Sequence, residues 1–428
     1  MRDRPQYWKM EPNPSNHKKR ILVFVPEFPR LTETFIQREI SKLIDLGSLD
    51  ITVFSIQETS GEVFSNVKKH LVYRHLNLFV LIRAWVYFLL RKPAKILCEY
   101  RAFISFDRGF SGGKVPYKNS LLHKSIFFTK SVGYAHLFLQ FDPDHIHANF
   151  MSWPSTMAMI ASKLLGIDYS ISAHALDIMV EGEYFEQKVS SAKFVAICNK
   201  FAYQYCLDHS GQQDTSNVLM MYHGVDSVKV FSNSVQIDKP DRVVLFNGGS
   251  RLVEKKGQKY LIESMRLLKD KGYDFELHIA GPGPLYAELV SQIKSLNLED
   301  NVFIHGNGEG VPFDIIVSYL KIADLVVQSN INLDSGDADG VPTFVIESAL
   351  ARKPIVATDA GSITDLIEDG VTGLIVHQRN PVVFAEAVIK LLDDPELASR
   401  LGASARERAL QMFDLDRNIK ELESLLLK

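Results

Sequence analysis

The sequence predicts an α/β protein built from two doubly wound, parallel-sheet domains. The chain has 428 residues, more than one hydrophobic core usually serves. Short, β-branched apolar runs alternate with helical segments in both halves, and a polar stretch over 226–241 separates the halves as a linker. Such strands, joined by helices, are typical of parallel sheets covered on both faces. We therefore expect two Rossmann-like domains with a ligand cleft between the carboxyl ends of their strands.

The first half, residues 20–225, is predicted to form the N-terminal domain. Residues 1–19 are polar and precede the first strand as a tail, and a helix is expected over 33–47. Apolar, β-branched runs predict strands at 20–28, 50–57, 145–150, 169–175, 193–198 and 218–225.

The second half, residues 242–410, repeats strand and helix with little else between them. Strands are predicted at 242–249, 275–281, 301–306, 324–329, 354–360 and 372–377. Helical patterns lie at 257–272, 285–298 and 313–323. The last segment, 411–428, is longer than this sheet needs, and we expect it to pack back across the cleft.

Composition excludes several classes of protein. A formal net charge of −3 argues against a nucleic-acid-binding protein. Three cysteines without a CxxC pair give neither a disulfide framework nor a structural zinc site. The N-terminus lacks the apolar core of a signal peptide, so we expect a cytoplasmic protein.

Residues 68–101 form a basic, apolar region. Its apolar run, 76–90, is shorter than the ~20 residues that span a bilayer, and Arg83 interrupts it. Eight Lys or Arg residues are opposed there by Glu99 alone. This pattern fits a helix lying on the anionic inner face of the cytoplasmic membrane, and it equally fits a buried helix with a basic rim.

Glycine-rich loops follow three strands of the second half. After the first of these strands, Arg251 and Lys256 place two cations beside a helix start, which favours a phosphate or diphosphate, although a solvated face looks similar. No Walker or GxGxxG pattern is present. The loop residues expected near a ligand are Gly248, Gly249, Gly281, Gly306 and Asn307.

The stretch DSGDADGVPTFVIESALARK follows the strand at 324–329. Asp339 lies in its loop, Pro342 is near the first helical position, and Glu347 lies about a turn and a half into an apolar helix, on one face with Thr343. A buried carboxylate needs partners, and two neighbouring hydroxyls, such as those of a ribose, would supply them.

These motifs together resemble the retaining GT-B glycosyltransferases of family 4. The resemblance rests on DGVPTFVIE, SRLVEKKG, IAGPGPL and ATDAGSITDLIEDGVTGLIV, which occur in the family's order across most of 242–380. In the first half, FPRLTETFIQREI, HIHANF and SISAHALDI are similar to exopolysaccharide transferases of the colanic-acid type.

The resemblance implies roles for individual residues. Arg251 and Lys256 would hold the donor diphosphate, Glu347 the ribose hydroxyls and Asp339 the transferred sugar. His174 matches the family histidine near the reacting centre, or it is a satisfied core histidine. The residues expected at the sugar and on the acceptor side are Gly340, Val341, Pro342, Thr343, Thr32 and His147.

Two positions depart from the family pattern. Asp339 stands where the family usually has Glu, and Asp365 stands where the Glu of GxxE is expected. The donor sugar of this protein can therefore differ from that of other family members. Thr32 is the candidate for acceptor contact because PEFPRLTETF has no glycine, whereas Thr34 with Gln37 suits a helix cap better. Asp337 and Asp339 resemble a metal-binding DxD, but Ile346 replaces the acid that a calcium loop needs.

The sequence therefore predicts a retaining glycosyltransferase that uses a UDP- or GDP-linked sugar and needs neither metal nor cofactor. Its expected acceptor is a polysaccharide or polyprenyl-linked intermediate of cell-surface glycan synthesis. A nucleotide-sugar-binding subunit without catalysis is the alternative. A GT-B phosphorylase is disfavoured because no lysine suits pyridoxal phosphate.

Overall fold

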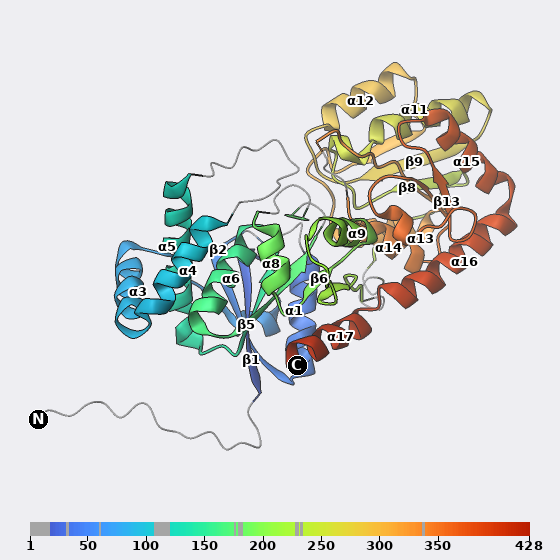
Figure 1. The fold of residues 1–428 in the computed structure, drawn as a ribbon. Coiled ribbons are helices and arrows are strands. Elements are labelled where there is room, and N and C mark those ends of the chain that lie inside the picture. The colour runs from blue at the N-terminus through green and yellow to red at the C-terminus, as the bar shows by residue number, and fades with distance from the viewer. Residues whose placement is uncertain are drawn as a thin grey trace, which may run out of the picture.

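The computed structural model contains two parallel β-sheets, each with helices packed on both faces (Figure 1). This is the predicted fold class. The residues that the structure describes are 18–30, 34–59, 61–106, 120–174, 177–178, 183–226, 231, 234–335 and 339–428.

The N-terminal sheet has seven strands in the order β3-β2-β1-β4-β5-β6-β7, all paired in parallel. The six predicted strands are present, and β3 adds an edge strand inside the basic region. The strands are β1 (Lys19–Phe28), β2 (Leu49–Glu58), β3 (Leu71–Tyr73), β4 (His145–Asn149), β5 (Asp168–Ala173), β6 (Val195–Ile197) and β7 (Val218–Met220).

Helices cover this sheet in two layers. One layer contains α1 (Thr34–Leu46), and the opposite, larger core contains α5 (Leu121–Phe138) and α6 (Trp153–Leu165). Among the described residues, no helix is both long and apolar enough to cross a membrane. The remaining helices of this domain are α2 (Ser65–Lys68), α3 (Leu78–Arg91), α4 (Pro93–Ser105), α8 (Phe185–Ser191) and α9 (Lys200–His209).

The C-terminal sheet has the order β10-β9-β8-β11-β12-β13, again all parallel. Because β8 lies between β9 and β11, the strand order reverses there, which is where ligands bind in open α/β sheets. The strands are β8 (Val243–Asn247), β9 (Phe275–Ala280), β10 (Val302–His305), β11 (Leu325–Gln328), β12 (Ile355–Thr358) and β13 (Leu374–Val376).

Two cores flank the C-terminal sheet, one on each face. The first contains α11 (Gln258–Asp270), α12 (Tyr286–Ser295) and α15 (Pro381–Asp393); the second contains α13 (Phe313–Ile322), α14 (Thr343–Leu350) and α16 (Pro395–Met412).

The last helix, α17 (Leu415–Leu427), leaves the C-terminal domain and lies against α1 (Figure 1). Its buried residues Ile419, Leu422 and Leu426 share a core with Ile36 and Ile40 of α1. The N-terminal domain is therefore completed by the end of the chain.

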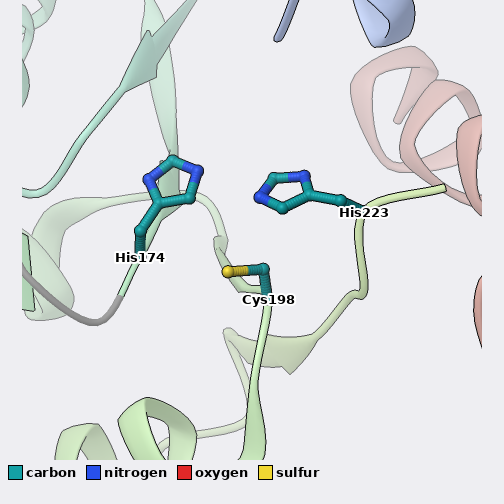
Figure 2. Close-up of side chains that lie close together, drawn as sticks. All are labelled: His174, Cys198 and His223. Atoms are coloured by element: carbon teal, nitrogen blue, oxygen red, sulfur yellow. The ribbon is translucent and has the colours of Figure 1, made fainter. Parts of the chain in front are cut away.

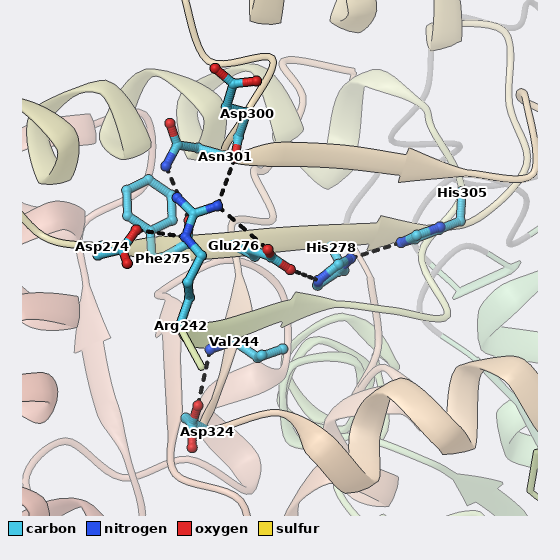
Figure 3. Close-up of polar contacts among 10 residues, drawn as sticks. All are labelled: Arg242, Val244, Asp274, Phe275, Glu276, His278, Asp300, Asn301, His305 and Asp324. Atoms are coloured by element: carbon cyan, nitrogen blue, oxygen red, sulfur yellow. Dashed lines mark hydrogen bonds and ion pairs between the residues drawn. The ribbon is translucent and has the colours of Figure 1, made fainter. Parts of the chain in front are cut away.

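A chain of polar contacts crosses the C-terminal sheet (Figure 3). Arg242 contacts Asp274 and Glu276, and Glu276 pairs with His278. His278 Nδ1 lies 2.9 Å from His305 Nε2. Burial lowers the pKa of His305 to about 4, so this ring is neutral at physiological pH. These contacts link the start of β8 to β9 and β10, so their role is to stabilise the sheet.

Candidate functional site

The loops after β8 and β11 meet at the point where the strand order reverses. Gly257 allows this approach: its φ is +63°, and a Cβ there would lie 2.0 Å from the carbonyl oxygen of Ser329. The Ser329 hydroxyl donates to the Lys256 carbonyl at 3.0 Å, and the Ile331 N–H donates to the Lys255 carbonyl at 2.8 Å. Two segments more than 70 residues apart in the chain thus form one surface.

Asp339 lies on this surface between two lysines. Its carboxylate is 2.7 Å from Lys256 Nζ and 3.3 Å from Lys255 Nζ, and it accepts a hydrogen bond from Asn330. Burial alone would raise the pKa of Asp339, but Lys256 and Lys255 together hold it below its ordinary value. Asp339 is therefore ionised and partly neutralises the cations expected to bind a diphosphate.

Glu347 is 4% exposed among the apolar side chains of α14. Its carboxylate makes no hydrogen bond or ion pair within the described part of the chain. Burial raises the pKa of Glu347 to about 7, an effect that the charge of Arg38 on α1 reduces. A buried carboxylate without a partner can accept hydrogen bonds from a ligand.

The other residues predicted to bind the donor lie around Asp339 and Glu347. Arg251 is exposed at the mouth of the β8 loop, and Thr343 is exposed at the start of α14. Gly248 and Gly249 pack against Phe344, which brings α14 onto the same loop. Gly340, Val341 and Pro342 are partly exposed in front of the helix.

Two of the glycine-rich loops serve mainly to pack against neighbouring backbone. A Cβ on Gly281 would lie 1.8 Å from the carbonyl oxygen of Ser250, so glycine is needed for the two loops to touch. Gly306 has φ +81° in a tight turn beside Gly310, and Asn307 is exposed and accepts a hydrogen bond from the Tyr286 hydroxyl. These residues shape the edge of the site.

On the N-terminal side, His174, Cys198 and His223 come together from the loops after β5, β6 and β7 (Figure 2). The two imidazole rings are stacked with centroids 5.0 Å apart, and the Cys198 sulfur lies beside them. His223 Nδ1 is 2.6 Å from Glu39 Oε1, and His174 Nδ1 is 3.6 Å from Asp177 Oδ1.

Charge favours the protonated imidazoles and the thiolate in this cluster. Burial would lower the pKa of His223, but Glu39 and Cys198 raise it well above its ordinary value. Burial would likewise lower the pKa of His174, yet Asp177 raises it overall. Burial would raise the pKa of Cys198, but His223 and His174 lower it.

The same three residues are a possible metal-binding set. One ligand atom from each of His174, Cys198 and His223 lies within 4.8 Å of the others, and such donors suit zinc after a small movement. Nε2 of both histidines lacks a hydrogen-bond partner among the described residues. Glu39, whose Oε1 is 2.6 Å from His223 Nδ1, would orient that ring for a metal or for a substrate proton.

Contacts across the cleft hold the two halves of the site together. The backbone N–H of Lys200 donates to Asp365 at 2.7 Å, and the Tyr222 hydroxyl donates to the same carboxylate at 3.2 Å. Ser362 donates to Asn199, the residue after Cys198, at 3.0 Å. Asp365, which departs from the family pattern, therefore joins the domains.

A groove of about 890 Å³ opens between α1, residues 62–66 and the start of α13. Arg38 and Lys42 of α1 and Phe313 of α13 line it. Its volume suits a sugar-sized or larger ligand.

Two acceptor-side predictions need separate treatment. His147 is 3% exposed, and its nitrogens are hydrogen bonded to the hydroxyls of Ser170 and Ser172. Burial lowers its pKa to about 4, so it is a neutral core histidine, and the prediction that it faces the acceptor is wrong. Thr32 lies outside the described residues, as do most of the predicted tail and Asp337.

Several site residues escaped the sequence analysis. Lys255 was passed over beside Lys256, and Cys198, His223 and Glu39 were not connected with His174. A usable signal existed, since Cys198 and His223 each follow a parallel strand, where ligand-binding residues gather.

Comparison with known proteins finds a family model that matches part of the chain. Residues 228–408 match the model of the family described as glycosyl transferases group 1. The match covers less than half of the 428 residues of the chain. Lys255, Lys256, Asp339 and Glu347 all lie within the matched region.

Curated relatives match part of the chain. The alpha-D-kanosaminyltransferase of Streptomyces kanamyceticus is 34% identical over 168 residues, which cover 39% of this chain and 40% of the relative. The putative colanic acid biosynthesis glycosyltransferase WcaL of Salmonella typhimurium is 30% identical over 205 residues, 47% of this chain and 49% of the relative. The chain thus spans less than half the length of these relatives.

A solved structure matches the whole architecture. HepE of Anabaena, crystallised with UDP and glucose, superposes with a TM-score of 0.61 at 17% identity, covering 95% of this chain and 99% of HepE. At this identity the likeness concerns the fold, which confirms the predicted GT-B arrangement.

Proposed function

We propose that this protein is a retaining glycosyltransferase that moves a sugar from a nucleoside diphosphate sugar to an acceptor hydroxyl. The observation that carries the proposal is Glu347, a buried carboxylate without a described partner, located on the helix that follows the lysine-paired Asp339. A ribose with two adjacent hydroxyls would satisfy it.

The donor diphosphate is proposed to bind Arg251, Lys255 and Lys256. Negative charge grows on the diphosphate as the glycosidic bond breaks, and fixed cations stabilise that charge where it develops. Asp339 occupies the two lysines at 2.7 and 3.3 Å, so diphosphate binding would release its carboxylate toward the sugar hydroxyls.

The acceptor is proposed to bind in the 890 Å³ groove along α1, and Phe35 of the same helix lies against the His174 ring, with ring centroids 5.1 Å apart. Nδ1 and Nε2 of His174 both lack a hydrogen-bond partner in the described part of the chain, and Asp177 Oδ1 lies 3.6 Å from Nδ1. We propose attack on the same face of the sugar, with the departing phosphate oxygen taking the acceptor's proton. This path retains the configuration at the anomeric carbon.

A UDP- or GDP-linked donor and a glycan or polyprenyl-linked acceptor fit the relatives best. HepE was crystallised with UDP, and WcaL is described as a colanic acid biosynthesis glycosyltransferase. By analogy, this chain would extend a lipid-linked or polysaccharide intermediate of cell-surface glycan synthesis.

The test is a panel of UDP- and GDP-sugars incubated with the protein, with and without a lipid-linked acceptor pool, while released nucleotide is measured. Lys256→Ala should lower turnover by roughly 10²-fold or more. Lys271→Ala is the matched control, since Lys271 is an exposed lysine at the end of α11. The anomeric configuration of the product, read by NMR, tests retention.

Two results would overturn the proposal. Near-normal turnover in both Arg251→Ala and Lys256→Ala would remove the diphosphate assignment. Donor binding without turnover, even with acceptor present, would instead support the binding subunit.

A further inference from the structure

Three side chains with metal-binding atoms meet at the carboxyl edge of the N-terminal sheet. His174 and Cys198 directly follow β5 and β6, and His223 lies in the loop after β7. These strands are paired in parallel, so their ends lie side by side. One ligand atom of each residue is within 4.8 Å of the others, and Figure 2 shows Cys198 beside the two rings. The sheet therefore holds the three donors together.

The two histidines present nitrogen atoms that have no partner outside this cluster. Both ring nitrogens of His174 and Nε2 of His223 are buried, and none is hydrogen bonded to another part of the described chain. Ring stacking, with centroids 5.0 Å apart, accounts for the position of the rings but leaves these atoms unsatisfied. A single acceptor hydroxyl would occupy one nitrogen. A cation would occupy one nitrogen of each ring together with the sulfur.

Glu39 determines which nitrogen of His223 is left for a ligand. Glu39 Oε1 on α1 lies 2.6 Å from Nδ1 of His223, so Nε2 is the remaining ligand atom. A carboxylate bonded to the far nitrogen is the usual arrangement behind a zinc-bound histidine, where it sets the tautomer and the orientation of the ring.

Cys198 is also supported from outside the cluster. It is a free, partly buried cysteine, and the side-chain N–H of Asn199 donates to its Sγ at 3.6 Å. Asn199 is itself fixed, because its Oδ1 accepts hydrogen bonds from the Ala202 N–H at 2.8 Å and from the Ser362 hydroxyl at 3.0 Å. The sulfur is therefore positioned by the fold.

Sulfur and imidazole nitrogen together select a zinc-like cation. Zinc binds cysteine sulfur at about 2.3 Å and histidine nitrogen at about 2.0 to 2.1 Å, whereas calcium and magnesium take oxygen ligands. Around a tetrahedral zinc these ligand atoms would lie about 3.4 to 3.6 Å from one another. Since the three atoms are already within 4.8 Å, side-chain movements of about 1 Å would close the site.

We propose that His174, Cys198 and His223 bind a zinc ion and that the bound ion inhibits sugar transfer. Binding forms one zinc–sulfur and two zinc–nitrogen bonds, and the thiol proton of Cys198 passes to solvent. With three protein ligands, zinc keeps a fourth position for water. Zinc binding is independent of the proposed function. The inhibition rests on that function, because the ion would occupy His174, which is expected near the reacting centre.

The test is titration of the EDTA-treated and dialysed full chain with zinc chloride, in competition with a chromophoric chelator. One zinc should bind per chain with a dissociation constant below about 1 μM. Cobalt chloride is the second probe, because a cobalt–thiolate bond gives a charge-transfer absorption that reports the sulfur ligand directly. Neither titration contains a nucleotide sugar, so its outcome is separate from that of the proposed glycosyl transfer.

Variants identify the ligands. Cys198→Ala and His223→Ala each remove one ligand and should lower the zinc affinity about 100-fold or more, whereas Glu39→Gln removes only the support of His223 and should lower it about 10- to 100-fold. The matched controls are Cys98→Ala, at an exposed cysteine, and His377→Ala, at an exposed histidine, and both should bind zinc as the wild type does. Thermal melting checks that each variant folds.

Inhibition is measured with a donor sugar that the protein turns over. Zinc should slow nucleotide release by the wild type at the concentrations that fill the site, and EDTA should restore the rate. No zinc bound at these concentrations, bound cobalt without the thiolate absorption, or equal zinc affinity in Cys198→Ala and the wild type would overturn the site. Zinc that fills the site without slowing transfer would overturn the inhibition.

Discussion

Glu347→Gln changes one buried atom of the candidate donor site and leaves the shape of the side chain almost unaltered. The carboxyl is 4% exposed, and burial raises its pKa to about 7 from an ordinary value of 4.5. Between these two pH values, the folded protein keeps a proton that the unfolded chain releases. The free energy of unfolding of the wild type must therefore fall as pH rises through this window.

The magnitude follows from the two pKa values. At about 1.4 kcal/mol per pH unit, the difference between 4.5 and about 7 corresponds to about 3 kcal/mol. Gln does not titrate, so the variant lacks this loss. Relative to the wild type, Glu347→Gln should gain about 3 kcal/mol between pH 4.5 and 7 and keep this gain above pH 7.

The assay is urea unfolding of both proteins from about pH 5 to about pH 8, with the difference in unfolding free energy plotted against pH. Glu288→Gln, at an exposed position on α12, is the control and should show no pH-dependent difference. A difference between wild type and Glu347→Gln that stays constant with pH would refute the reasoning.

The same substitution should weaken nucleotide binding. Charge-assisted hydrogen bonds to a ribose contribute about 1.5 to 3 kcal/mol, so titration calorimetry with UDP and GDP should show roughly a ten- to hundredfold loss of affinity. If Glu347→Gln is more stable than the wild type but binds nucleotide more weakly, Glu347 contributes to ligand binding at a cost in stability. Unchanged affinity for both nucleotides would exclude the ribose contact.

Three further predictions concern the rest of the site. Asp339→Asn frees Lys256 from its ion pair, so calorimetry should show that the variant binds UDP at least about fivefold more tightly than the wild type does. The rate of sugar transfer from the nucleotide sugar should fall. Asp365→Ala removes acceptors for the Lys200 N–H and the Tyr222 hydroxyl, which should cost about 1 to 2 kcal/mol in urea unfolding; an unchanged midpoint would contradict this. EDTA should leave glycosyl transfer unchanged, whereas added zinc should inhibit it through Cys198, and Cys198→Ala should relieve the inhibition. Loss of activity with EDTA would show instead that a metal is required.

Much of the fold could be predicted because buried parallel strands are apolar, short and regularly spaced. The two sheets match those expectations closely, since both faces of each are covered. The short strand β3 was missed because Leu71–Tyr73 lies within a basic, apolar stretch without strand boundaries. The strand predicted over 218–225 ends at Met220, because the chain turns there into the loop that carries His223.

The candidate site was only partly readable from the sequence. The donor motifs lie in loops that follow strands, so their gathering could be anticipated, but the pairing of Asp339 with Lys255 and Lys256 depends on the packing of two loops. The error at His147 has a physical cause. His145 and His147 are two residues apart on β4 and therefore share one face, where Phe194 covers both rings.

The helix α1 links the two halves of the site through consecutive residues. Arg38 acts on the charge of Glu347 across the cleft, and Glu39 bonds to His223 in the histidine–cysteine cluster. Because α17 packs against α1, the chain that leaves the C-terminal domain also fixes the helix that faces that domain.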